Sequence, residues 1–159
     1  MGSLPLFKRK VLVSIRPEYA SKIMDGQKTV ELRRRFPEAT AVGATILIYS
    51  SSPVQAIVGY ATIKDVLRLP VKTIWRDYGT AACISKADFD TYFSGLTEGY
   101  AIILADVKSL SNQLKATDLQ EEFGFVAPQS FRYVDSEYDA LLKNERQETT
   151  RRHKRRHRA

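Results

Sequence analysis

The segment EGYAIILADVKSL, residues 98–110, is the most strongly strand-like part of the chain, and its apolar core runs from Tyr100 to Val107. Several other segments at close spacing are also rich in β-branched and aromatic residues and are bounded by turn-forming residues. The predicted strands are 10–16, 28–35, 44–51, 54–69 and 98–110, with a short extended segment at 127–134. Gly59 is the position at which the long 54–69 strand is expected to bend.

Short helices are predicted in the connections between these strands. Pro17 suits the first position of one helix, and Gly26 suits its end. Ser85 and Thr117 are each followed three residues later by an acid or an amide, which is typical of a capped helix start, so Thr117 is paired with Gln120. The predicted helices are 17–26, 70–79, 85–95, 117–124 and 135–150.

This order of elements does not follow the strand–helix alternation of a parallel, doubly wound sheet. It indicates an α+β fold: a small, mostly antiparallel β-barrel of about five or six strands, with short helices in the connections. The length of 159 residues fits one domain with a tail, so we expect a domain over 1–145 and a tail over 146–159.

The positive charge of the chain is concentrated at its C-terminal end. Residues 1–150 hold 19 Lys and Arg against 18 Asp and Glu, whereas the last nine residues, RRHKRRHRA, hold six Lys and Arg and no acid. A basic run of this density is typically disordered and binds polyanions such as nucleic acid, although a solvated tail that improves solubility is the plainer alternative. The tail residues predicted to contact nucleic acid are Arg151, Arg152, Lys154, Arg155 and Arg156.

Several classes of chemistry lack the residues they need. Both histidines, His153 and His157, lie in the tail, so the body cannot build a Ser/His/Asp or Cys/His triad. Cys83 is the single cysteine, which argues against a zinc site and fits a reducing compartment. The acidic residues are dispersed and form no cluster of the kind that binds magnesium, so we expect no metal. No phosphate-binding glycine motif is present, so we expect no nucleoside triphosphate and no dinucleotide cofactor. With no membrane-spanning run and no signal peptide, the sequence predicts a cytoplasmic protein that does not enter a membrane; it does not indicate an oligomeric state.

The segment DGQKTVELRRRF, residues 25–36, is the most unusual in the sequence because it combines a turn, a strand and five charged residues within KTVELRRR. Side chains alternate between the two faces of a strand. Val30 and Leu32 are therefore predicted to face the core, while Thr29, Glu31 and Arg33 share the other face. Lys28 is placed at the rim of that face. The cluster is either a structural ion-pair network or the wall of a site for an anionic ligand.

The stretch SIRPEYASKIMDGQKTVELRRR resembles the opening of an ASCH domain, a group of PUA-like barrels related to RNA-binding modules. The resemblance lies in the P-x-Y-A-x-x-I helix and in a G-x-K-x-x-E-x-R signature formed by Gly26, Lys28, Glu31 and Arg33. The later segment APQSFRYV resembles a second patch of some members. Together the resemblance covers about residues 10–143 and implies a small PUA-like barrel whose cleft, lined by the signature residues, accepts RNA or a modified nucleoside.

The resemblance also implies two enzymatic alternatives. Some members are ribonucleases, and a metal-independent ribonuclease here would use Glu31 as the base that activates the 2′-hydroxyl and Lys28 as the proton donor or electrostatic stabiliser. Arg33 would hold the phosphate, and Tyr49 or Tyr133 would add a phenol. A compact branch hydrolyses N4-acetylcytidine with a hydroxyl nucleophile three residues after its lysine. Glu31 occupies that position here, which argues against the same amidohydrolase route.

Simple binding requires fewer catalytic groups than either enzyme. Aromatic rings stack on unpaired bases and cations hold phosphates, and the segment QSFRYV interleaves both types of side chain. Our interpretation is an RNA-binding ASCH domain, with ribonuclease, modified-nucleoside amidohydrolase and a regulatory module with a purely structural cluster as the alternatives. The predicted nucleic-acid-binding residues of the body are Lys28, Thr29, Glu31, Arg33, Tyr49, Gln129, Ser130, Arg132 and Tyr133.

Overall fold

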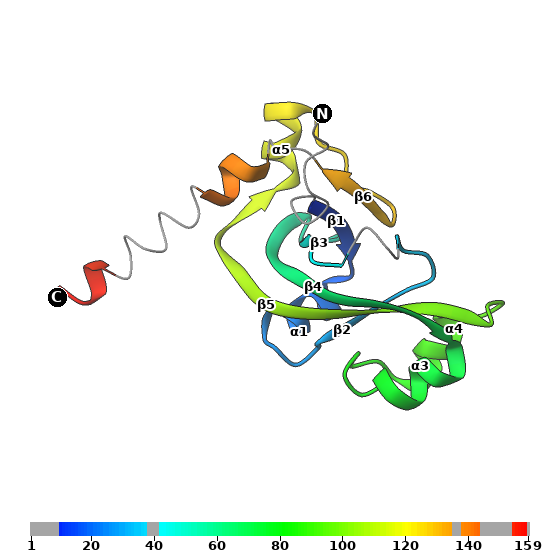
Figure 1. Ribbon diagram of the computed structural model, residues 1–159. Coiled ribbons are helices and arrows are strands. Elements are labelled where there is room, and N and C mark those ends of the chain that lie inside the picture. Colours follow the sequence, from blue (N-terminus) through cyan, green and yellow to red (C-terminus); the bar gives the residue numbers. More distant parts are fainter. Residues whose placement is uncertain (1–9, 38–41, 135–137, 144–153, 159) are drawn as a thin grey trace, which may run out of the picture.

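The computed structural model describes residues 10–37, 42–134, 138–143 and 154–158. Six strands form one sheet in the order β2-β5-β4-β3-β1-β6 (Figure 1). The strands are β1 (Lys10–Ile15), β2 (Val30–Arg33), β3 (Thr45–Ser50), β4 (Ala56–Pro70), β5 (Glu98–Lys115) and β6 (Phe131–Val134). The helices are α1 (Pro17–Met24), α3 (Val71–Tyr78), α4 (Lys86–Tyr92) and α5 (Ala116–Phe123), and residues 138–143 are also helical.

The predicted α+β class and the mostly antiparallel sheet are confirmed. Neighbouring strands run antiparallel throughout the described sheet, except for the parallel pair β1 and β3. The sheet is not closed into a barrel by main-chain pairing, because β2 and β6 are its two edge strands in the described chain. The strand expected over 28–35 is shorter than predicted and covers only Val30–Arg33.

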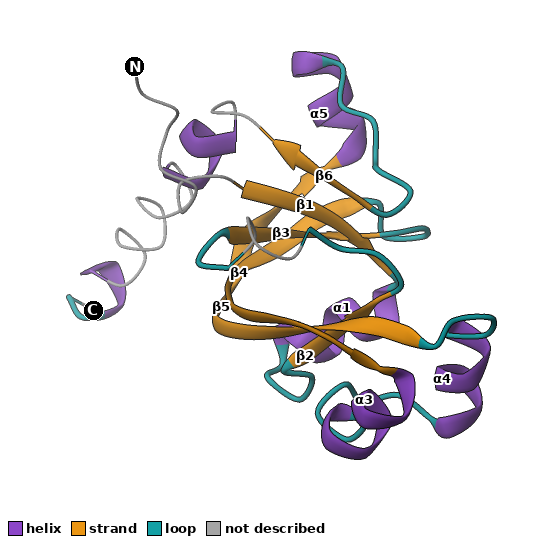
Figure 2. Ribbon diagram, turned by 45° about the vertical axis from the view of Figure 1, so that its right-hand side comes forward, coloured by secondary structure: helices purple, strands orange, loops and turns teal. Residues whose placement is uncertain are grey.

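The long strands β4 and β5 form a ribbon that runs through the whole sheet (Figures 1 and 2). Their pairing shifts register at three places, between Ile57 and Gly59, between Tyr60 and Thr62, and between Ile63 and Asp65. Such irregularities bend and twist a strand pair, which agrees with the bend expected at Gly59. A Cβ atom at Gly59 would lie 2.4 Å from the Met24 sulfur and 2.5 Å from the Lys108 carbonyl oxygen. The residue therefore allows α1 and β5 to approach β4 closely.

This bent ribbon supports three packed clusters of apolar side chains. The central cluster holds Val13, Ile48 and Ile63 together with Ala20 and Ile23 of α1. A second cluster packs α5 and the helical segment 138–143 against one end of the sheet. The third packs α3 and α4 against β2 and the other end of β5, and Figure 2 shows these two helices side by side there. Val30 and Leu32, on the apolar face of β2, therefore pack against the helical layer of α3 and α4.

The helix ends follow the sequence signals in most places. The Ser85 side chain accepts a hydrogen bond from the Asp88 amide at the start of α4, as predicted. Gly26 and Gly124 have φ values of +80° and +68°, which suit glycine at the ends of α1 and α5. The predicted Thr117 cap is wrong, because α5 begins one residue earlier and its N-cap residue, Lys115, makes no side-chain capping bond. β5 continues to Lys115, and this extended pairing sets the start of the helix.

Candidate nucleotide pocket

A pocket of about 370 Å³ lies where the end of β1, the start of α1, β2, α4 and the loop before β6 meet. Its floor includes Lys28 and Glu31, which are buried, and its rim includes exposed side chains from α1, α4 and the loop. The volume is in the lower part of the range of about 300–1,000 Å³ that small-molecule sites occupy. The lining residues are Ser14, Ile15, Arg16, Tyr19, Lys28, Glu31, Leu32, Arg33, Ser51, Ile84, Asp88, Thr91, Tyr92 and Gln129.

Lys28 is buried at the floor of this pocket, with 3% of its surface exposed, so the prediction that it lies at the rim is wrong. Its Nζ atom donates a hydrogen bond of 2.6 Å to the Ala82 carbonyl, lies 3.8 Å from Glu31 Oε2 and lies 5.1 Å from the centre of the Tyr19 ring. The segment around Ala82 follows α3 and therefore draws the amine inward. Burial lowers the pKa of Lys28, and the neighbouring Glu31 carboxylate opposes that shift in part.

Glu31 is the second buried charge of the pocket. It is 7% exposed, and its Oε2 atom has no hydrogen-bond partner within the described ranges. The separation of 3.8 Å from the Lys28 amine is an ion pair without a hydrogen bond. A buried carboxylate oxygen without a donor carries a desolvation cost that a donor group on a ligand would remove.

Arg33 joins the two edges of the open sheet. One nitrogen of its guanidinium group, Nη2, donates to the carbonyls of Ser14 on β1 and Ser130 before β6, at 2.8 and 3.0 Å. Its Nε atom is buried and has no partner in the described chain. A free guanidinium fork for phosphate was expected here, but the Nη2 atom is instead bound to two main-chain carbonyls of the protein.

Tyr92 and Arg34 fix the outer edge of β2. The Tyr92 hydroxyl donates to the Leu32 carbonyl at 3.1 Å and accepts from the Arg34 amide at 3.2 Å. The Arg34 side chain donates to the carbonyls of Tyr92 and Ser94, at the end of α4. Burial raises the pKa of Tyr92, and Arg33 opposes that shift, so the phenol keeps the proton that it donates to the Leu32 carbonyl. These contacts hold the strand that carries Glu31 and Arg33.

Of the residues predicted from sequence, the pocket brings together Lys28, Glu31, Arg33 and Gln129. The other predicted residues do not line it in the described structure. Thr29 precedes β2 and its side chain is exposed. Ser130 contributes its carbonyl to the Arg33 contact, while the Arg132 guanidinium lies 5.6 Å from the centre of the Phe125 ring and Tyr133 is exposed on the edge strand β6.

Tyr49 is also away from the pocket. Its side chain is 5% exposed and packs in the second apolar cluster, with its ring 5.6 Å from that of Phe125. Burial raises the pKa of this phenol. The predicted tail contacts Arg151 and Arg152 lie outside the described residues, and Lys154, Arg155 and Arg156 are exposed.

Sequence reasoning missed several residues that line the pocket. Tyr19 could have been found, because it belongs to the P-x-Y-A helix on which the family resemblance rests. Arg16 precedes that helix and had a comparable signal. Ser14, Asp88 and Tyr92 had none, since only tertiary packing brings the end of β1 and α4 beside β2.

The described residues hold neither a metal-binding cluster nor a membrane-spanning helix. No group of three or more His, Cys, Asp or Glu side chains there is arranged to hold a metal ion. Among those same residues, no helix has the length and apolar character needed to span a membrane.

Comparison with known proteins places this geometry in a family. A relative from Zymomonas mobilis named ASCH domain-containing ribonuclease is 33% identical over 131 residues, which cover 82% of this chain and 87% of the relative. Crystal structures of the ASCH protein from that organism, including one serine-to-alanine and one tyrosine-to-phenylalanine variant, superpose with TM-scores of 0.80 at 32% and 31% identity. They cover 89% and 86% of this chain and 98% of each of those chains.

A hypothetical protein from Leishmania major shares the fold, with a TM-score of 0.60 at 16% identity over 89% of this chain and 97% of that one. The family model for the ASCH domain matches residues 13–143. The predicted family is confirmed, and the chain belongs to the ASCH domain family.

Proposed function

We propose that this ASCH domain binds single-stranded RNA and takes one nucleotide of it into the pocket lined by Lys28, Glu31 and Arg33. The observation that carries the proposal is the pair of buried polar atoms without hydrogen-bond partners in the described chain, Glu31 Oε2 and Arg33 Nε, on two residues that line one pocket. Buried polar groups in folded proteins are nearly always paired, so two of them in one pocket indicate a ligand with both a donor and an acceptor.

The composition of the pocket also supports a nucleotide. Arg16, Lys28 and Arg33 supply three cations against the two acids Glu31 and Asp88, which suits a ligand with a phosphate. The rings of Tyr19 and Tyr92 and the side chain of Ile84 offer flat or apolar surface for a base. A nucleotide within a duplex is stacked and paired, so a single strand is the form that reaches a pocket of this size.

The proposal is tested by fluorescence anisotropy with an end-labelled single-stranded RNA, with the matching RNA duplex as competitor. Glu31→Gln is expected to weaken binding by about 10- to 100-fold, and Arg16→Ala is expected to weaken it severalfold. Each variant removes a charged contact with the RNA. Glu121→Gln on α5 and Lys72→Ala on α3 are matched controls, since both side chains are exposed and lie outside the pocket. Equal affinity of all five proteins for the RNA would contradict the proposal.

A second candidate function is a metal-independent ribonuclease in the same pocket. Two observations favour it: the name of the Zymomonas mobilis relative, and burial of Lys28, which lowers the pKa of its amine and so makes its ammonium form a better acid. In this candidate Glu31 takes the proton of the 2′-hydroxyl, whose oxygen attacks the neighbouring phosphorus. Lys28 gives a proton to the 5′-oxygen as its bond to phosphorus breaks, which leaves a 2′,3′-cyclic phosphate.

The nuclease candidate is tested by incubating labelled RNA with the protein in EDTA and in Mg²⁺ or Mn²⁺. Cleavage in EDTA that disappears in Lys28→Met and Glu31→Gln, with a cyclic phosphate at the new end, would support it. Cleavage that persists in both variants would come from a contaminant or from another site. Cleavage that requires the added metal would contradict the metal-independent route.

A further inference from the structure

Glu31 and Arg33 offer a ligand two buried contacts of opposite hydrogen-bonding character. Glu31 Oε2 is an acceptor and Arg33 Nε is a donor, and neither has a hydrogen-bond partner among the described residues. They are two residues apart on β2 and both line the pocket, so they share one face of the strand at a spacing of about 7 Å. A ligand that forms hydrogen bonds with both groups must carry a donor and an acceptor a short distance apart.

The charges of these two groups restrict the ligand further. Glu31 carries a carboxylate, so the ligand group that meets it is a neutral donor such as a hydroxyl rather than an anion. Arg33 carries a guanidinium, and the Lys28 amine lies 3.8 Å from the Glu31 oxygen. The ligand can therefore carry an anionic oxygen next to its own donor group, on the side that faces Lys28 and Arg33.

We propose that the pocket recognises the ribose 2′-hydroxyl together with the adjacent 3′-phosphate, so that Glu31 selects RNA over DNA. The hydroxyl donates to Glu31 Oε2, and the phosphate accepts from Arg33 Nε and Lys28 Nζ. In a ribonucleotide these two groups are attached to neighbouring carbon atoms of one sugar, so a single nucleotide offers the donor and the anion together. The inference rests on the proposed function and adds the class of nucleotide and the residue that selects it.

A base edge also presents donors and acceptors, but it fits this pair of residues less well. A neutral base would leave the cationic side of the pocket, formed by Arg16, Lys28 and Arg33, without an anion. A 2′-deoxynucleotide supplies the phosphate but leaves the Glu31 carboxylate oxygen buried without a donor. The expected cost of that loss corresponds to an affinity about 10- to 100-fold lower, as for other hydrogen bonds to charged groups.

The experiment compares three labelled single strands of one sequence by anisotropy in EDTA, with strand integrity checked on a gel. The first strand is RNA, the second is DNA, and the third is 2′-fluoro RNA, which keeps the size of the substituent and the sugar pucker but cannot donate. RNA is expected to bind about 10- to 100-fold more tightly than the other two. In Glu31→Gln this ratio is expected to fall to less than about threefold, because the amide is a weaker acceptor than the carboxylate. Glu121→Gln is expected to keep the full ratio.

A second arm uses mononucleotides as competitors and tests the position of the phosphate. A ribonucleoside 3′-monophosphate is expected to compete more strongly than its 5′ isomer or the 2′-deoxy 3′-monophosphate. The proposal is overturned if RNA and 2′-fluoro RNA bind equally, if Glu31→Gln leaves their ratio unchanged, or if methylation of the base edge, rather than loss of the 2′-hydroxyl, abolishes binding. If no strand binds, the proposed function itself fails; if all three bind equally, only the present inference does.

Discussion

At the residue scale, Lys28 and Glu31 are the two charged side chains buried at the floor of the pocket. Their Nζ–Oε2 separation of 3.8 Å and the bond from Lys28 to the Ala82 carbonyl keep the amine in place. Removing one partner of a buried pair typically costs about 3–5 kcal/mol, whereas replacing both can cost little. The pair therefore fixes two opposite charges at the floor of the pocket.

The lowered pKa of Lys28 gives a testable dependence of stability on pH. In the unfolded chain this amine has its ordinary pKa of 10.5, and burial lowers the value in the folded protein. Between the two values the unfolded state binds more protons, so the contribution of Lys28 to the free energy of unfolding rises with pH; below the lowered value it is constant. Urea denaturation at a series of pH values between the lowered and the ordinary pKa is expected to show this rise in the free energy of unfolding for the unaltered protein. The double variant Lys28→Met/Glu31→Gln is expected not to show it.

The double variant is used because it leaves no unpaired buried charge. Lys72→Met is the control, since that lysine is exposed on α3 and is expected to follow the unaltered protein. Parallel curves for the unaltered protein and the double variant would show that Lys28 does not titrate differently in the folded state.

At the element scale, β2 is a strand of four residues whose outer edge is held by a side chain instead of by another strand. Tyr92 of α4 takes that role through the Leu32 carbonyl and the Arg34 amide. The Arg34 side chain in turn donates to carbonyls at the end of α4, where a cation also complements the helix dipole. A short helix and a short strand thus stabilise each other and position Glu31 and Arg33.

Tyr92→Phe tests this coupling because it removes one hydroxyl and keeps the ring. The Leu32 carbonyl and the Arg34 amide lose a partner, so the free energy of unfolding is expected to fall by about 1–3 kcal/mol. Affinity for RNA is expected to fall as well, since the strand that carries Glu31 is less well fixed. Tyr78→Phe on α3 is the matched control, because the Tyr78 hydroxyl has no hydrogen-bond partner in the ranges described. A loss of stability as large in Tyr78→Phe would argue against a special role for Tyr92.

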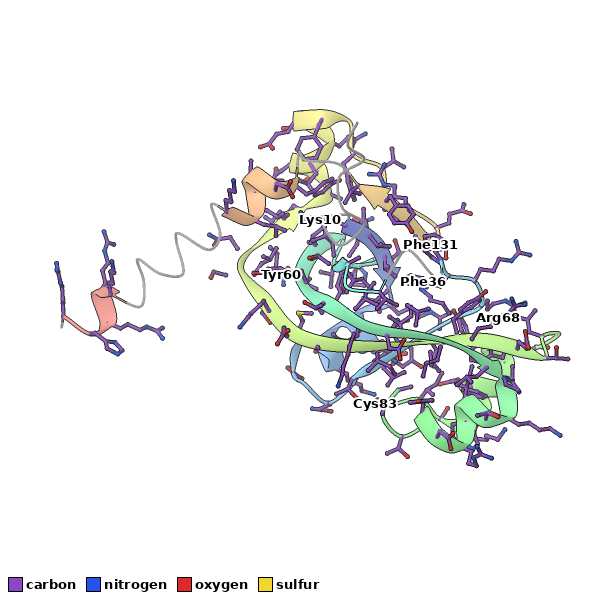
Figure 3. The ribbon with its side chains drawn as sticks, in the orientation of Figure 1. Lys10, Phe36, Tyr60, Arg68, Cys83 and Phe131 are labelled. Carbon is purple, nitrogen blue, oxygen red and sulfur yellow. The ribbon has the colours of Figure 1, made fainter. Side chains whose placement is uncertain are left out.

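At the scale of the whole molecule, Arg33 joins the two edge strands that main-chain pairing leaves apart. Its Nη2 atom donates to Ser14 and Ser130, and the Ser14 hydroxyl donates to the Pro128 carbonyl at 2.5 Å. The ring centres of Phe36 and Phe131 lie 5.3 Å apart, and Figure 3 labels these two side chains close together. The open sheet is therefore closed by side chains, and the closing contacts also place Gln129 at the pocket rim.

Arg33→Lys is expected to weaken this closure, because the lysine side chain is shorter and its amine does not reach the position of Arg33 Nη2, which binds both carbonyls. Amide hydrogen exchange in residues 130–134 is expected to speed up, while exchange in the central strands β3 and β4 stays slow. Arg35→Lys is the control, since that neighbouring side chain is exposed. Unchanged exchange at β6 in Arg33→Lys would mean that β1 alone holds the strand.

The basic tail is expected to add affinity without sequence preference. Deleting residues 151–159 removes six cations, so binding of single-stranded RNA should weaken and depend less steeply on salt. The slope of the logarithm of the binding constant against the logarithm of the salt concentration should fall by up to about 0.7 for each lost phosphate contact. The preference for RNA over DNA should remain, because Glu31 lies outside the tail. An unchanged salt slope would show that the tail does not contact the RNA.

The sequence by itself determined the strands, most helix ends and the family. Alternating apolar residues, Pro17, Ser85 and Gly26 act over a few neighbours, so their effects can be read locally. The same holds for strand alternation, which predicted that Glu31 and Arg33 share one face, and for the G-x-K-x-x-E-x-R spacing, which indicated the family. Tertiary structure alone decided that Lys28 is buried, that Tyr49 packs in the core, and that the Nη2 atom of Arg33 joins the edges of the sheet. These outcomes depend on partners such as Ala82, Phe125 and Ser130, which lie about 50 to 100 residues away in sequence. The partners come into contact with these side chains only when the bent β4–β5 ribbon brings the ends of the sheet together.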